Sequence, residues 1–115
     1  MRIVDKSSRI KLDELSKMAE EMFGDLVKAV VDIKRDMMVV DAELHADEEA
    51  LLIEHGSKQS NIWGINLYPE LEGADFVEFD SMINLRPSQE NRSREVEDPA
   101  IREHIQRIVN DLVIR

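Results

Sequence analysis

The clearest structural signal in this chain is an apolar stripe at helical spacing close to its C-terminus. Asp98 is suited to cap a helix that begins at Pro99, because aspartate accepts hydrogen bonds from the free N–H groups of a first turn and proline has no N–H to leave unpaired. The stripe itself consists of Ile101, Ile105, Ile108, Val109, Leu112 and Val113. A helix this one-sided has to bury its stripe, so the rest of the chain must supply an apolar surface.

A second amphipathic helix is predicted over residues 11–23, with Gly24 where a helix commonly ends. Its apolar residues have the same three- and four-residue spacing and are Leu12, Leu15, Met18, Ala19, Met22 and Phe23. A shorter helix is expected over residues 47–55, capped by Asp47. Segments that are rich in β-branched residues or alternate in polarity predict four strands, at residues 26–33, 37–44, 62–68 and 76–86.

These elements predict an α+β fold built as a single domain over residues 1–115. We expect a mainly antiparallel sheet of about four strands, with the two long amphipathic helices on one face and the short third helix elsewhere. A chain of 115 residues, 43% of them hydrophobic, has no room for a second independent core, that is, for a second domain.

Composition excludes several classes of protein. No apolar run reaches the roughly 18 residues of a membrane helix. The N-terminus also lacks the apolar segment of a signal peptide, so we expect a cytoplasmic protein. The chain has no cysteine, which excludes disulfides and cysteine-bound metals. Its 15 Lys and Arg against 25 Asp and Glu give a net charge of −10, which disfavours nucleic acids and anionic membranes as partners.

Alternation along the predicted strands places polar side chains together on the sheet face away from the long helices. The members of this expected polar face are Asp41, Glu43, His45, Asn66, Glu78, Asp80, Asn84 and Arg86. A solvated polar face is common in antiparallel sheets, and that ordinary interpretation stays open. Asp and Asn are nevertheless depleted in strands, so their concentration here favours a functional site.

The candidate catalytic residues on this face are Glu43, His45, Glu78 and Asp80. A carboxylate crowded by other carboxylates has a raised pKa and can act as a general acid or base, and Arg86 would then hold an anionic substrate. Carboxylates and one imidazole can also ligate a divalent metal cofactor without cysteine. The metal ligands expected in that case are Glu43, His45 and Asp80.

Residues 88–97 form the longest polar loop of the chain and lead towards the last helix. The candidate anion-binding residues in and beside this loop are Arg86, Asn91, Arg92 and Arg94. Guanidinium groups near a helix N-terminus suit a carboxylate or a phosphate. The alternative is a solvated loop in which the arginines pair with Glu90, Glu95 and Glu97.

Seven stretches covering most of the chain resemble a small prokaryotic family of uncharacterised proteins, a domain of unknown function. They are KAVVDI at 28–33, ELHAD at 43–47, GSKQ at 56–59, WGINLYP at 63–69, FDSMINLRPSQ at 79–89, NRSR at 91–94 and VEDP at 96–99. The resemblance implies family membership but no activity, cofactor or catalytic residue. In the family pattern glycine is usual at Asp41–Ala42, Glu90 and Glu95.

Two functions remain open from the residues alone. The first is a binding or interaction module that uses the polar face and the arginine-rich loop for a small anionic ligand or for self-association as a homo-oligomer. The second is a small enzyme, such as a metal-assisted hydrolase of an anionic substrate. An enzyme requires the candidate residues to converge in one partly desolvated pocket, whereas an interaction module presents a flatter face.

Overall fold

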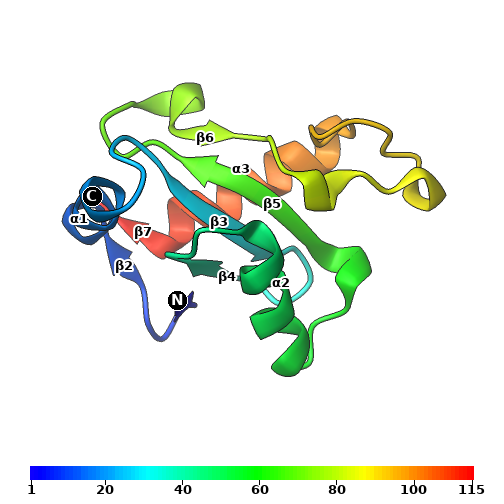
Figure 1. Ribbon diagram of the computed structural model, residues 1–115, viewed down its shortest axis with the longest axis horizontal. Helices are drawn as coiled ribbons and strands as arrows, with labels where there is room; N and C mark the ends of the chain where they lie inside the picture. Colours follow the sequence, from blue (N-terminus) through cyan, green and yellow to red (C-terminus); the bar gives the residue numbers. More distant parts are fainter.

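The computed structural model, which describes residues 1–115, is an antiparallel sheet with helices on both faces (Figure 1). The five strands lie in the order β1-β4-β3-β5-β6. Their bounds are Arg2–Val4 for β1, Val27–Asp32 for β3, Met37–Val40 for β4, Ile62–Leu67 for β5 and Val77–Glu78 for β6. The expected α+β class is therefore confirmed, with five strands in the sheet in place of four.

Three α-helices complete the architecture. Their bounds are Leu12–Glu21 for α1, His45–Glu54 for α2 and Pro99–Leu112 for α3. A second, two-stranded parallel sheet joins β2 (Ile10–Lys11) to β7 (Val113–Ile114). Figure 1 shows α2 in front of the main sheet, with α3 behind it. No helix is both long enough and apolar enough to span a membrane.

The main core lies between the sheet and the two long helices. The Asp98 side chain accepts from the backbone N–H of Ala100 at 2.9 Å, and Pro99 begins α3 as its sequence predicts. The fully buried side chains in this core include Leu15, Ile65, Leu67, Ile105 and Leu112. The long helices pack on one face with their apolar stripes inward, but α1 ends at Glu21, so Met22 and Phe23 of the predicted stripe lie beyond it and are exposed.

The opposite sheet face is covered, contrary to the expectation of an exposed polar face. Leu52 of α2 packs there against Val30, Val39 and Ile62 in a second, smaller core. Strand β4 ends at Val40, because Asp41 has a φ of 72° and turns the chain out of the sheet. Glu43 and His45 therefore do not lie on a strand.

Helix α2 begins earlier than predicted. His45 is its first residue, and Leu44 precedes it in an extended conformation. Asp47 lies within the first turn and does not act as the cap. Its acidic side chain still stands where the helix dipole favours negative charge.

The predicted strand over residues 76–86 is largely wrong. Only Val77–Glu78 pair with β5, and short 3₁₀ turns follow at Met82–Asn84 and Pro87–Gln89. Beyond β6, the side-chain amide of Asn84 pairs with β5 in place of a strand. Gly64 N–H donates to Asn84 Oδ1 at 2.8 Å, and Asn84 Nδ2 donates to the Gly64 carbonyl at 3.0 Å.

Residues 80–97, which we call the 80–97 segment, are held against β5 around this contact. A Cβ atom on Gly64 would lie 2.5 Å from Cβ of Ser81, so the close approach requires glycine. Asn84 Nδ2 also donates to the Arg94 carbonyl at 3.0 Å, and the backbone N–H of Ser81 donates to the same oxygen at 3.0 Å. The segment therefore has a fixed path across the edge of the sheet.

We expect the change Asn84→Asp to destabilise the protein by at least about 2 kcal/mol. Asn84 is fully buried, and the substitution removes both amide donors and places a carboxylate beside two carbonyl oxygens. Urea unfolding would measure the loss, with Asn110→Asp on the exposed surface of α3 as the matched control. Equal, small effects of the two changes would contradict the role given to the Asn84 amide.

Candidate functional site

One pocket brings together three of the residues expected to form a site. His45, Asp80 and Arg94 line a cavity of about 200 Å³ between the start of α2, strands β3 and β5, and the 80–97 segment. Its other polar walls are Lys28, Asn66 and Ser81. Its apolar walls include Leu44, Met82 and Ile83.

His45 is held in one orientation and one protonation state. Its side chain is buried, and Nε2 lies 2.7 Å from the backbone carbonyl of Ile65. A carbonyl can only accept, so Nε2 carries the proton and Nδ1 has the free lone pair. Burial lowers the pKa of His45, and the positive charge of Lys28 lowers that pKa further. The imidazole is therefore neutral at pH 7.

Asn66 on β5 has a fixed amide with one unused oxygen. Its Nδ2 donates to Glu78 Oε1 at 2.8 Å and to the Asp80 carbonyl at 3.3 Å, which determines which end of the amide is nitrogen. The side chain is 6% exposed, and its Oδ1 is buried without a hydrogen-bond partner. Such an acceptor carries a desolvation cost that a bound donor would relieve.

Glu78 lies outside the pocket and supports Asn66. Its Oε1 accepts from Asn66 and also from the Tyr68 hydroxyl at 3.0 Å. Burial and the neighbouring Glu78 raise the pKa of Tyr68 to about 12, so Tyr68 keeps its proton and remains a donor. Glu78 therefore positions the Asn66 amide, and its expected catalytic role stays a prediction.

Two cations stand at the pocket. Arg94 Nε contacts Asp80 Oδ1 at 2.7 Å, and both side chains are about half exposed. Lys28 projects from β3, with Nζ 5.1 Å from the centre of the Phe23 ring, and forms no ion pair. Asp80 and the arginine-rich loop therefore meet in one pocket, but Glu43, Glu78 and Arg86, which the enzyme hypothesis also required there, do not line it.

Arg86 is not in this pocket. Its guanidinium stacks 4.7 Å from the Trp63 ring, while Nε donates to the Ile83 carbonyl at 3.1 Å and Nη2 donates to the Ile62 carbonyl. Glu49, which is half-buried, lies 3.6 Å from Arg86 Nη2 as its counter-ion. The residue expected to hold an anion instead fastens the 80–97 segment to β5.

Asn91 and Arg92 also lie away from the pocket. Asn91 is 3% exposed, and its Nδ2 donates to the backbone carbonyls of Asn84, Ser93 and Glu95. Its donors are thus occupied within the loop. Arg92 has an exposed side chain, and its backbone N–H donates to Glu97 at 2.9 Å. Of the four expected anion-binding residues, only Arg94 faces the pocket.

The expected metal ligands are not assembled in this structure. Glu43 is exposed and lies outside the pocket that His45 and Asp80 share. No three His, Asp or Glu side chains of the chain are placed to hold a metal ion together. The strand that was expected to align Glu43 with His45 ends before either residue.

Two pocket residues, Lys28 and Ser81, were not singled out as site candidates from the sequence. Lys28 is the one cation of a strand segment whose other charged residue is Asp32, and a lysine is seldom buried in a strand without a partner. Ser81 follows Asp80 where the strand was expected to continue, so its place under the pocket depends on the unforeseen turn. Only the first of these was accessible to sequence reasoning.

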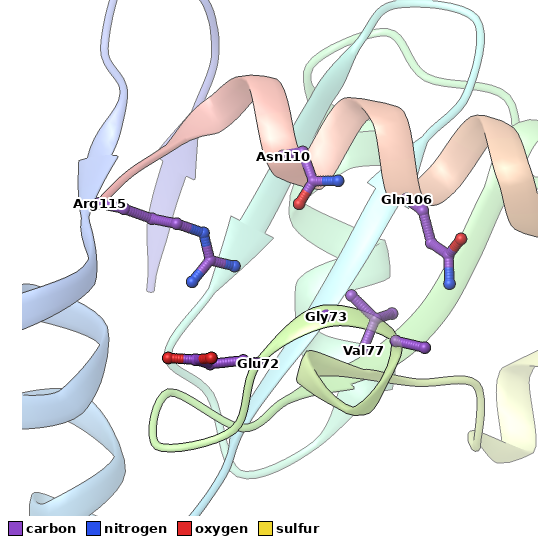
Figure 2. A pocket seen from close by; sticks show the side chains of 7 residues that line it. Glu72, Gly73, Val77, Gln106, Asn110 and Arg115 are labelled. Atoms are coloured by element: carbon purple, nitrogen blue, oxygen red, sulfur yellow. The ribbon is translucent and has the colours of Figure 1, made fainter.

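A larger groove elsewhere is a weaker candidate. Figure 2 shows Glu72, Gln106, Asn110 and Arg115 around a groove of about 510 Å³ between α3 and the loop before β6. None of these four polar side chains is buried. A site with no desolvated polar group has little to orient a ligand, so the smaller pocket is preferred.

One protein family matches nearly the whole chain. Residues 2–112 match the family described as Protein of unknown function (DUF5674). The chain belongs to the DUF5674 family. The expected membership in a family of uncharacterised proteins is thereby confirmed. No curated protein and no solved structure matches the chain, so a function for this DUF5674 domain has to be argued from its pocket.

Two residues of this DUF5674 domain other than glycine have a left-handed backbone at positions where the resemblance implies glycine. Asp41 has a φ of 72° and Glu90 a φ of 59°, whereas Glu95, the third such position, has no positive φ. Side chains other than glycine adopt these angles at a cost. Both residues make turns that position other elements, and neither lines the pocket.

A buried glutamate lies one helical turn from His45. The residues of α2 that face the sheet are His45, Glu48 and Leu52. Both carboxyl oxygens of Glu48 are buried without a hydrogen-bond partner. Burial raises the pKa of Glu48 to about 10, so the side chain is a neutral acid at pH 7.

The raised pKa of Glu48 predicts that the effect of Glu48→Gln on folding stability depends on pH. The unfolded chain releases the proton near pH 4.3, whereas the folded chain keeps it up to about pH 10. Folding stability therefore falls as the pH rises between these values, by at most about 1.4 kcal/mol per pH unit. The glutamine variant lacks this loss, so its stability relative to the parent protein should rise from pH 5 to pH 9.

Chemical denaturation at several pH values would measure the effect. Glu54→Gln on the exposed part of the same helix is the control and should show no such trend above pH 6. Parallel stability curves for the parent protein and Glu48→Gln would show that Glu48 titrates normally.

Proposed function

We propose that this chain binds a small organic anion in the pocket at the start of α2. The observation that carries the proposal is the convergence of Lys28, Arg94 and a helix N-terminus on one cavity in a chain of net charge −10. Acidic residues outnumber basic ones elsewhere in the chain, yet here two cations stand with a single acid, Asp80. Such a local reversal of charge favours an anion.

The cations are available for a ligand. The Arg94–Asp80 pair is exposed, and exposed ion pairs contribute little to stability, so Arg94 can exchange partners at low cost. Lys28 has no acidic partner to give up. The first turn of α2 adds the positive end of the helix dipole and N–H groups without partners inside the helix, although the N–H of Asp47 already donates to the Leu44 carbonyl at 3.2 Å.

The volume of the cavity limits the size of the ligand that it can hold. A volume of about 200 Å³ lies below the ~300–1,000 Å³ of pockets for drug-sized compounds. The side chains of Leu44 and Met82 at its wall are largely exposed, which offers an apolar surface to the body of the ligand. The cavity therefore suits a compact organic acid better than a nucleotide.

An enzymatic role in the same pocket is the second candidate. The observation that favours it is the neutral imidazole of His45, whose free Nδ1 belongs to a residue of the pocket wall. Such a nitrogen can accept a proton from a bound substrate near pH 7. Turnover of a bound organic acid that is lost in His45→Gln would move the proposal from binding to catalysis.

Anion binding can be measured by NMR titration of ¹⁵N-labelled protein with acetate and with phosphate. We expect the largest shifts at the backbone amides of Ala46 and Asp47 and near Ser81. The change Arg94→Gln should weaken binding about tenfold, which corresponds to about 1.4 kcal/mol for a lost charged hydrogen bond.

Arg92→Gln is the matched control, because Arg92 lies two residues away and does not line the pocket. It should leave the affinity unchanged. Shifts that appear elsewhere on the surface, or equal losses in the two variants, would contradict the proposed site.

A further inference from the structure

Some hydrogen-bond acceptors of the pocket have no partner. They restrict the class of ligand further than the positive charge of the pocket does. Asn66 Oδ1 is buried without a partner, and the other end of the amide is held by Glu78 and the Asp80 carbonyl, so the amide cannot rotate to offer a donor. His45 Nδ1 is a second acceptor, since Nε2 donates to Ile65. A simple anion would leave both of them without a hydrogen bond.

A third acceptor stands beside these two. The Asp80 carboxylate lines the same pocket and uses Oδ1 for Arg94, which leaves Oδ2 free. Asn66 and Asp80 line the same pocket as His45. The pocket thus joins an acceptor group of an amide oxygen, an imidazole nitrogen and a carboxylate oxygen to the cations Lys28 and Arg94.

From this arrangement we infer that the ligand is a small zwitterion of the amino-acid class, with an ammonium group beside its carboxylate. A primary ammonium has three N–H donors, which match the three acceptors in number and kind. The carboxylate would lie towards Lys28, Arg94 and the first turn of α2. The apolar side chain of the ligand would contact Leu44 and Met82, whose side chains are 56% and 62% exposed.

The inference rests on the proposed function and adds to it a requirement for the amine. An α-hydroxy acid supplies one donor in place of three and no positive charge to face Asp80. It should therefore bind more weakly than the amino acid and more tightly than the unsubstituted acid. Affinity in this series is the property that separates the inference from simple anion binding.

The experiment compares L-leucine, 2-hydroxy-4-methylpentanoate and 4-methylpentanoate as probes, by NMR titration of the full chain. We expect leucine to bind at least tenfold more tightly than 4-methylpentanoate, with the hydroxy acid between them. All three probes should shift the NMR signals of the Ala46 and Asp47 backbone amides. Equal affinities would overturn the inference and leave anion binding intact, whereas no shift with any probe would overturn both.

Two variants test which pocket residues recognise the ammonium group and which recognise the carboxylate. Asn66→Leu should reduce the preference for leucine over 4-methylpentanoate while leaving the affinity for 4-methylpentanoate nearly unchanged. Arg94→Gln should weaken the binding of both probes alike. If Asn66→Leu does not fold, the comparison of the three probes on the parent protein still decides the question. An unchanged preference in a folded Asn66→Leu variant would overturn the inference.

Discussion

The pairing of the Asn84 side chain with Gly64 is the contact on which the rest of the site depends. Strand β6 covers β5 only at Asn66 and Leu67, which leaves the N–H and C=O of Gly64 without a strand partner inside the protein. Unpaired buried backbone groups are costly. The Asn84 amide satisfies both groups, and Arg86 reaches the Ile62 carbonyl along the same edge. Side chains therefore complete the sheet where the backbone turns away.

This way of closing the sheet also builds the pocket. Because β6 ends at Glu78, residues 80–83 lie beside α2 and form one wall of the cavity. The return of the same segment brings Arg94 to Asp80 at 2.7 Å, although the two residues are 14 positions apart. The departure from regular structure and the candidate site have the same origin.

Much of the fold could be predicted from periodicity, and much of the site could not. The stripe that begins at Ile101 and the cap at Asp98 led to α3, because helix signals are local. The strand expected over residues 76–86 failed because alternation does not reveal that the side chain of Asn84 replaces backbone pairing. His45 and Asp80 were named from an expected strand alternation, and Arg94 from its place in the polar loop before α3. They share a pocket through turns at Asp41 and after Glu78, which follow from tertiary contacts.

Hydrogen exchange at the Gly64 amide tests the central claim most directly. If the Asn84 side chain completes β5, that amide should exchange as slowly as those of the central strand β3, although no strand covers it. An exchange rate like that of an exposed edge amide would contradict the account. The 80–97 segment would then not be fixed on the sheet, and the pocket wall that it forms would lose its physical basis.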